Sequence, residues 1–434
     1  MRKSNIKLEY ELNDFPKPFK SSILGIQHVL VMFTAMVGMP LIIASVIDLP
    51  AAQRVQMLTG VLLGCGVGTM ISALGLGFVG AKLPIVMGVF YIFIGPIVAI
   101  SNTAGLAAAM TAIFIGGLIE GSLSPIICKL RKYFPPLVTG TVITIIGVAL
   151  MPIAINNAVA SGSENFAQGN TLFLAAFTII AIVLINRLTT GFAKAISLFI
   201  ALLLGYLMGG ILGFLDFSTV ASAEWFGIPK FMPYGGFAWP GWSGLIAIVI
   251  CFLVSAMETL ADTLAVSNAV QVETTHERLR GAIAIDGFGS SFAALFGGVP
   301  LTSYSQNIGV ISLTGVGSRF VVAFGGAFLI LMAFIPKFSA LISMMPDPVL
   351  GGTLVVMFGT VASIGIQILH GEMETRRDVL IFAISLGLAV GVTVAPEGSF
   401  DILSSNIKLV VTDGIVLGAI AALILNQLLP QEKK

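Results

Sequence analysis

The sequence predicts an all-α polytopic membrane protein with fourteen transmembrane spans in two inverted repeats of seven. Its 434 residues are 57% hydrophobic and only 10% charged, whereas soluble domains carry roughly 25% charged residues. Mean hydropathy is +1.02. Apolar runs of about 20 residues, the length that crosses a bilayer core, follow one another along the chain. Lys and Arg are divided unequally between alternate loops.

The polar residues 1–21 are expected to form a retained cytoplasmic segment, because the apolar run that follows is too long for a signal-peptide core. Seven spans are expected at 22–47, 56–80, 83–100, 104–128, 134–157, 170–187 and 193–215. Seven more are expected at 242–270, 279–297, 300–316, 319–344, 347–369, 377–395 and 409–429. The third and tenth are short and broken, so we expect each to be part helix and part extended chain.

The distribution of basic residues supports the even number of spans. With the N-terminus inside, eighteen Lys and Arg residues lie on the cytoplasmic side. The outer loops hold only four: Arg54, Lys230, Lys337 and Lys408. A positive-inside bias of this size would be lost if one span were miscounted.

Two sequence matches suggest a duplication. PLVTGTVITIIG from Pro136 resembles PVLGGTLVVMFG from Pro348, and KLPIVMG around Pro84 corresponds to GVPLTSY around Pro300. An odd number of spans per copy requires the second copy to enter from the opposite side, which is a plan common in secondary transporters. Chance similarity between apolar segments is the alternative.

Residues 300–319, PLTSYSQNIGVISLTGVGSR, form a stretch broken by glycine, serine and proline between long apolar runs. Irregular backbone at membrane depth is tolerated only where it is buried in protein or lines a cavity, and in secondary transporters it binds substrate. Gln306 and Asn307 place two amides there, each able to donate and accept hydrogen bonds. Tyr91, after the break in the third span, could stack on a flat ring or could be an ordinary packing residue.

Carboxyl groups lie in two spans beside this break. Glu258 and Asp262 share one helical face, and intramembrane carboxylates usually face the bundle interior or a polar path. We expect Glu258 to contact substrate and Asp262 to support it or carry a proton, with structural pairing as the alternative. Asp286, which we place at the opening of the ninth span, could hydrogen-bond the break or have a substrate or proton role.

Gln27 and His28 lie near the start of the first span and are expected to make a polar contact with the Glu258 helix; ordinary packing of the histidine is the alternative. Glu120 is a buried-looking carboxylate to which the sequence assigns no role. The three cysteines imply neither a disulfide framework nor a metal site. A net charge of +1 gives no case for binding nucleic acid.

Together these residues resemble a known family. Gln306-Asn307-Ile308-Gly309, followed by Thr314-Gly315, is similar to the signature of the nucleobase–ascorbate transporter family, also called nucleobase:cation symporter family 2. The Gln27-His28 pair, the two carboxylates of the eighth span and Asp286 also resemble this family. The resemblance extends over essentially the whole chain.

The resemblance implies a core domain built from spans 1–4 and 8–11 and a gate domain built from spans 5–7 and 12–14. The corresponding ranges are 22–130 and 242–345 for the core, and 131–241 and 346–430 for the gate. It further implies a homodimer in the bacterial cytoplasmic (inner) membrane with both termini cytoplasmic, a proton as the coupling ion, and no cofactor. The implied substrate-binding residues are Glu258, Gln306, Tyr91 and Asn307, and the implied support or proton-coupling residues are His28, Asp262, Asp286 and Gln27.

Glutamine at the first motif position is similar to bacterial xanthine and uric acid permeases, whereas uracil permeases carry glutamate there. Ala261, Tyr304 and Val299-Pro300 depart from the family pattern close to the expected site. We therefore predict a proton-coupled symporter for xanthine, uric acid or both. A uracil or mixed nucleobase permease is the alternative, and an anion transporter of the same architecture is a further one. We expect no enzyme activity, because the sequence shows no metal-ligand cluster, nucleophile–base pair or phosphate-binding loop.

Overall fold

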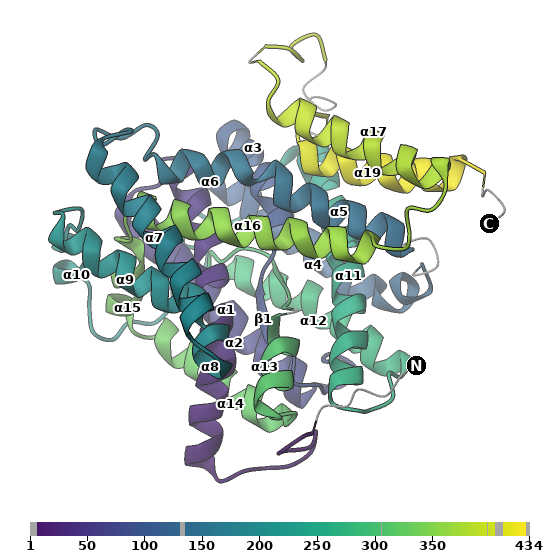
Figure 1. The fold of residues 1–434 in the computed structure, drawn as a ribbon, viewed down its shortest axis with the longest axis horizontal. Helices are drawn as coiled ribbons and strands as arrows, with labels where there is room; N and C mark the ends of the chain where they lie inside the picture. The colour runs from purple at the N-terminus through teal and green to yellow at the C-terminus, as the bar shows by residue number, and fades with distance from the viewer. Residues whose placement is uncertain (1–6, 131–134, 305, 397, 404–410, 431–434) are drawn as a thin grey trace.

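The computed structural model describes residues 7–130, 135–304, 306–396, 398–403 and 411–430 (Figure 1). Its first half contains α1 (Pro18–Val46), α2 (Ala51–Leu74), β1 (Met87–Val89), η1 (Tyr91–Phe93), α3 (Ile94–Ala104), α4 (Leu106–Leu130), α5 (Pro136–Ala149), α6 (Met151–Ala158), α7 (Gly169–Leu188), α8 (Gly191–Ala195), α9 (Ser197–Ile211) and α10 (Ser218–Ser222). The second half contains α11 (Gly241–Ala269), α12 (His276–Leu295), β2 (Leu301–Ser303), α13 (Gln306–Thr314), α14 (Arg319–Ala333), α15 (Pro336–Ser343), α16 (Asp347–Leu369), α17 (Arg376–Thr393) and α19 (Gly414–Leu428).

These elements confirm the all-α membrane class. Seven of the described helices are individually long and apolar enough to cross a bilayer, and an eighth span results if the bent pair α14–α15 is counted as one. The other predicted spans fall on shorter or broken helices. The count of fourteen crossings and the inverted repeat stay predictions.

Two predicted spans are wrong as continuous helices. Span 193–215 contains α8 and α9, and span 319–344 bends by 86° between α14 and α15. Proline explains the second break, because Pro336 lies in the first turn of α15, where it is tolerated but cannot continue a preceding helix. The prediction of a span at 134–157 is confirmed, because α5 and α6 together form one apolar helix from Pro136 to Ala158.

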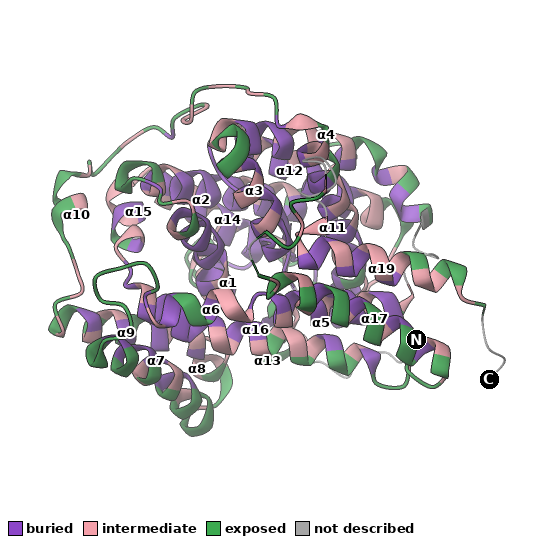
Figure 2. Ribbon diagram, turned by 90° about the horizontal axis from the view of Figure 1, so that it is seen from above, coloured by how far each residue is buried: buried purple, intermediate pink, exposed green. Residues whose placement is uncertain are grey.

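The helices pack in two groups. Helix group 1 comprises α1–α4 and α11–α14 with both strands, and its main contacts join α4 to α12 and α2 to α14. Helix group 2 comprises α5–α7, α9, α16, α17 and α19, with α16 packed on α5, α6 and α7. Seen from above, α7, α16, α5 and α17 lie along one side of the molecule, and the largely buried α2, α12 and α14 of group 1 lie along the other (Figure 2).

The two broken spans meet inside helix group 1. Strands β1 and β2 pair antiparallel, with Met87 opposite Ser303. These two residues are related by the same offset as Pro84 and Pro300, the positions that correspond in the proposed duplication. If a two-fold axis relates the two repeats, equivalent residues of the two strands pair with each other in antiparallel orientation, as Met87 and Ser303 do. This pairing therefore supports the inverted repeat.

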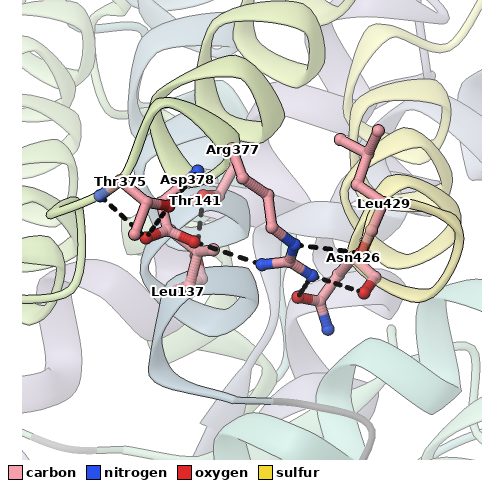
Figure 3. A network of polar contacts seen from close by, with 7 residues as sticks. All are labelled: Leu137, Thr141, Thr375, Arg377, Asp378, Asn426 and Leu429. Carbon is pink, nitrogen blue, oxygen red and sulfur yellow. Dashed lines mark hydrogen bonds and ion pairs between the residues drawn. The ribbon is translucent and has the colours of Figure 1, made fainter. Parts of the chain in front are cut away.

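A polar network joins α17 to the end of α19 (Figure 3). Arg377 donates from Nε to the Leu429 carbonyl at 3.0 Å and from Nη2 to the Asn426 carbonyl at 2.6 Å. It also pairs with Asp378 at 3.1 Å, and Asp378 forms a capping box with Thr375. One arginine thus satisfies carbonyls that the end of α19 would otherwise leave free.

Candidate functional site

The paired breaks form the frame of the candidate site. Tyr304 extends the pairing with a bond from its N–H to the Val86 carbonyl at 3.1 Å. Its hydroxyl accepts from the Val89 N–H at 3.1 Å and lies 3.0 Å from the Val89 carbonyl, to which it can donate. A phenylalanine at position 304 would leave both Val89 groups without these bonds. The departure from the family pattern at Tyr304 therefore has a structural role.

Helices begin directly after both strands. The chain turns from β1 into η1 and α3, and from β2 into α13. The amino ends of these two half-helices consequently lie at the strand pair. Their free N–H groups and partial positive charge favour an electron-rich ligand edge at that place.

Glu258 stands beside the strand pair on α11, at one wall of a small pocket. Phe90 lines the same pocket from the break, and the opposite wall is formed by residues of α5 and α19, including Val142, Ile146 and Leu423. Glu258 is half-buried, and its Oε2 atom is buried without a hydrogen-bond partner among the described residues. This carboxylate oxygen can accept an N–H from a ligand.

Asp262, one turn along α11, holds the break directly. Its Oδ2 atom accepts a 3.0 Å hydrogen bond from the Ser303 hydroxyl in β2. Ser303 also lies 3.2 Å from the hydroxyl of Thr259 on the same helix. Both Asp262 and Ser303 are buried. The two α11 carboxylates are therefore close along one face but differ in surroundings, because Asp262 is bound to the break and Glu258 has a free oxygen.

Asp286 lies in the middle of α12 and is completely buried, so its predicted position at the opening of a span is wrong. The helix starts earlier than predicted, with Thr275 as its N-cap accepting from the Arg278 N–H. Asp286 accepts hydrogen bonds from Thr259 at 2.5 Å and Ser255 at 3.2 Å, both on α11. Its side chain thus joins α12 to the Glu258 helix.

The contact from α12 to the break is made one turn after Asp286. The Ser290 hydroxyl accepts from the Leu301 N–H at 2.8 Å. It also donates to the Asp286 carbonyl at 2.6 Å. The backbone of β2 is therefore held by a serine that the sequence reasoning did not select.

His28 binds the tenth span rather than the Glu258 helix, so the predicted partner was wrong. Its Nδ1 atom lies 2.5 Å from Asn307 Oδ1, while the Asn307 amide donates to the Pro84 carbonyl. Since the amide nitrogen is engaged at Pro84, His28 Nδ1–H is the donor in the first bond. Asn307 therefore ties α1 and both breaks together, and it is fully buried. Gln27, the preceding residue, is half-buried.

Gln306 and Tyr91 occupy different environments. Gln306 begins α13 with an exposed side chain. Tyr91 is buried, donates its hydroxyl to the Ala35 carbonyl at 2.7 Å, and packs edge-to-face on Phe358 of α16 at 5.2 Å. Its neighbour Phe90, which the sequence reasoning missed, lines the pocket instead. Phe90 is extended and Tyr91 begins η1, and no local sequence signal told the two rings apart.

The chemistry of the site is that of selective binding. It combines an apolar pocket, one aromatic ring, one carboxylate oxygen with free acceptor capacity and two helix amino ends. Within the part of the chain that the structure describes, no group of three or more His, Cys, Asp or Glu side chains could hold a metal ion. A flat, polar-edged heterocycle suits this combination, because its faces are apolar and its edge carries N–H and carbonyl groups.

Comparison with known proteins gives consistent results. The sequence profile of a family described as a permease family matches residues 19–398. The chain is 35% identical over 432 residues to a putative purine permease of Clostridium perfringens, covering 99% of this chain and 95% of that protein. It is 34% identical to the xanthine permease of Bacillus subtilis, covering 94% and 93%. It is 33% identical to a uric acid transporter of Escherichia coli, covering 96% and 87%.

Solved structures share the fold. The transmembrane domain of the cyanobacterial bicarbonate transporter BicA matches with a TM-score of 0.66 at 16% identity, over 88% of this chain and 98% of that one. The murine anion transporter Slc26a9, in its inward-facing state, matches with a TM-score of 0.64 at 11% identity, over 96% and 69%. At these identities the likeness concerns the fold alone.

Proposed function

The chain belongs to the nucleobase–ascorbate transporter family, and from this premise we propose that it is a proton-coupled symporter for an oxopurine, xanthine or uric acid. The family predicted from the Gln306 motif is thereby confirmed, as is the prediction of a transporter rather than an enzyme. The chain is a multi-pass membrane protein related to purine permeases. The particular substrate and the coupling to protons are our proposal.

The observation that carries the proposal is the position of Glu258. Its unpartnered oxygen lies at a pocket walled by Phe90 on one side and by α5 and α19 on the other. An oxopurine ring would donate an N–H to this carboxylate and place its apolar face against Phe90. A site that matches hydrogen bonds in this way rejects ligands that leave a buried partner unpaired.

We assign the remaining residues around this contact. Gln306 is proposed as the second direct ligand, reaching the substrate edge from the start of α13. His28 and Asn307, with Gln27 next to them, would keep the break in shape. Asp262 and Asp286 would support the α11 face and take part in proton coupling. Tyr91 would complete the site through the backbone beside Phe90.

Alternating access is proposed to occur by movement of a core domain against a gate domain. Helix groups 1 and 2 support this division, because their main contacts lie within each group and the pocket lies between Glu258 of one and α5 and α19 of the other. We further propose a gate-mediated homodimer in the bacterial inner membrane with both termini cytoplasmic. The excess of Lys and Arg on one side supports that orientation.

The direct test is uptake of labelled xanthine into cells that lack their own nucleobase permeases, with and without a protonophore. Unlabelled uric acid, hypoxanthine, guanine and uracil serve as competitors. We expect the protonophore to abolish uptake and the oxopurines, but not uracil, to compete. A Glu164→Gln variant, altered in an exposed loop, is the matched control for Glu258→Gln. Competition by uracil alone would replace the proposal with a uracil permease.

A further inference from the structure

Glu120 is a carboxylate that the proposed binding site does not use. It lies on α4 and is 2% exposed. Neither of its carboxylate oxygens has a hydrogen-bond partner among the described residues. An ionised carboxylate left in this condition would cost several kcal/mol, because burial removes its hydration without replacing it. The side chain must therefore hold a proton or a cation in this conformation.

The position of Glu120 is set by a close helix crossing. Gly117 and Gly121 flank it on α4, and both lie against the backbone of Gly287 on α12. A side chain on Gly287 would overlap the Gly121 backbone, so glycine is required for this approach. Gly287 directly follows Asp286 in the chain. The crossing thus brings Glu120 beside Asp286, and the two negative groups interact electrostatically.

Asp286 supplies the connection to the pocket. Its Oδ1 atom is also buried without a partner among the described residues, whereas Oδ2 accepts from Thr259. Thr259 is adjacent in sequence to Glu258 and lies 3.2 Å from the Ser303 hydroxyl of the break. A chain of oxygen atoms therefore runs from the α4–α12 crossing to the strand pair and the substrate helix.

Charged groups on the neighbouring elements do not neutralise Glu120. From α12 the facing group is Asp286, and from α11 the carboxylates of Glu258 and Asp262 reach Asp286 electrostatically. Helix α3 contributes no ionisable side chain. On α4 itself, Cys128 and Lys129 lie two turns beyond Glu120. Arg280 of α12 interacts electrostatically with Cys128 at that level of the helix. The groups that interact electrostatically with the pair are acidic, which disfavours a negative charge on both Glu120 and Asp286 at once.

We propose that Glu120 and Asp286 form a protonation site at the α4–α12 crossing, apart from the substrate pocket, and that Glu120 carries the coupled proton. This inference rests on the proposed symport of an oxopurine. A change in the charge of this protonation site would be transmitted to the pocket through the hydrogen bonds of Thr259 to Asp286 and Ser303. A proton suits the site better than a metal cation, because the described residues contain no cluster of three acidic, histidine or cysteine ligands.

The test uses the purified full-length chain in proteoliposomes that contain a pH-sensitive dye. Three quantities are measured: proton influx on addition of xanthine, xanthine accumulation driven by a pH gradient, and exchange of labelled for unlabelled xanthine at equal pH. Glu120→Gln keeps the shape of the protonated acid but cannot release a proton. Coupling between two sites typically amounts to about 5–150-fold. We therefore expect proton influx and gradient-driven accumulation to fall by about tenfold or more in Glu120→Gln, while exchange is retained.

The controls separate this inference from the function on which it rests. Glu277→Gln, at an exposed position on α12, should behave as the unaltered chain. If the unaltered chain shows no xanthine-driven proton influx, the proposed symport is wrong. If it does and Glu120→Gln couples equally well, the role of Glu120 is wrong. Accumulation driven by a sodium gradient and lost in Glu120→Gln would overturn the proton in favour of sodium.

A second variant covers a failure of Glu120→Gln to fold. Glu120→Asp retains a titratable group at the crossing, so we expect it to keep coupled uptake but with a displaced pH profile. A purely structural role for Glu120 would lower uptake at every pH by the same factor without moving the profile. That outcome would refute the proposal.

Discussion

Replacing Asn307 with alanine should destabilise the protein more than a single lost side chain ordinarily does. Asn307 accepts from His28 Nδ1–H and donates to the Pro84 carbonyl. All three residues are buried. Asn307→Ala leaves one donor and one acceptor buried without partners. Each unsatisfied buried group costs about 1–3 kcal/mol, so the unfolding free energy should fall by about 2–6 kcal/mol.

The assay is equilibrium unfolding in mixed detergent micelles, followed by tryptophan fluorescence. Asn102→Ala, the same change at an exposed position in α3, is the matched control and should alter the unfolding free energy by less than about 0.5 kcal/mol. In a double-mutant cycle, His28→Ala removes the donor in advance. The second substitution should then cost less than it does alone, with a coupling of about 0.5–3 kcal/mol.

Two results would refute this reasoning. If Asn307→Ala and Asn102→Ala were equally stable, the network around the two breaks would contribute nothing to the fold. If the effects of His28→Ala and Asn307→Ala simply added, the contact between them would carry no energy. Xanthine uptake by Asn307→Ala should also decrease, because the break that holds the proposed site would lose its fixed shape.

Three further predictions follow from single contacts. Glu258→Gln should lower the affinity for xanthine by about tenfold or more, since a charged acceptor contributes about 1.5–3 kcal/mol; unchanged binding in calorimetry would remove this residue from the site. Tyr304→Phe should cost about 1–3 kcal/mol in unfolding free energy by freeing the Val89 backbone groups, and a neutral result would contradict the hydroxyl's role. Arg377→Ala should cost a similar amount, about 1–3 kcal/mol, and should speed hydrogen exchange at the end of α19; unchanged exchange there would refute the capping role.

The sequence predicted the helical spans well because each is a long apolar run bounded by polar residues. The prediction failed where the helix axis changes direction without a change in the hydropathy of the sequence. Residues on both sides of the bend between α14 and α15 are apolar, so the two helices were predicted as one span, although Pro336 was a visible signal. Apolar composition reports membrane depth, whereas a break depends on local backbone hydrogen bonding.

The residues of the site could be selected from sequence, but not their partners. Polar groups in apolar spans stand out individually, which is why His28, Asn307 and Asp286 were chosen. The bond from His28 to Asn307 joins positions 279 apart in the chain, and no local pattern specifies such a pair. Phe90 was not selected although it lines the pocket, because the sequence does not show that extended chain ends at Phe90 and η1 begins at Tyr91.

The distribution of directional bonds explains how the proposed movement could leave the site intact. The break is held by hydrogen bonds that stay within helix group 1, among them those from Ser303 to Asp262 and from His28 to Asn307. Across the pocket, the wall formed by α5 and α19 is mostly aliphatic, as at Val142 and Leu423. Dispersion contacts have little directional preference and are individually weak, so one aliphatic surface can slide past another and re-form its contacts. A hydrogen bond to a buried carboxylate cannot be exchanged in this way without leaving a charge unpaired. The group that carries the bonds should therefore move as a rigid unit, and substrate bound at Glu258 should move with it.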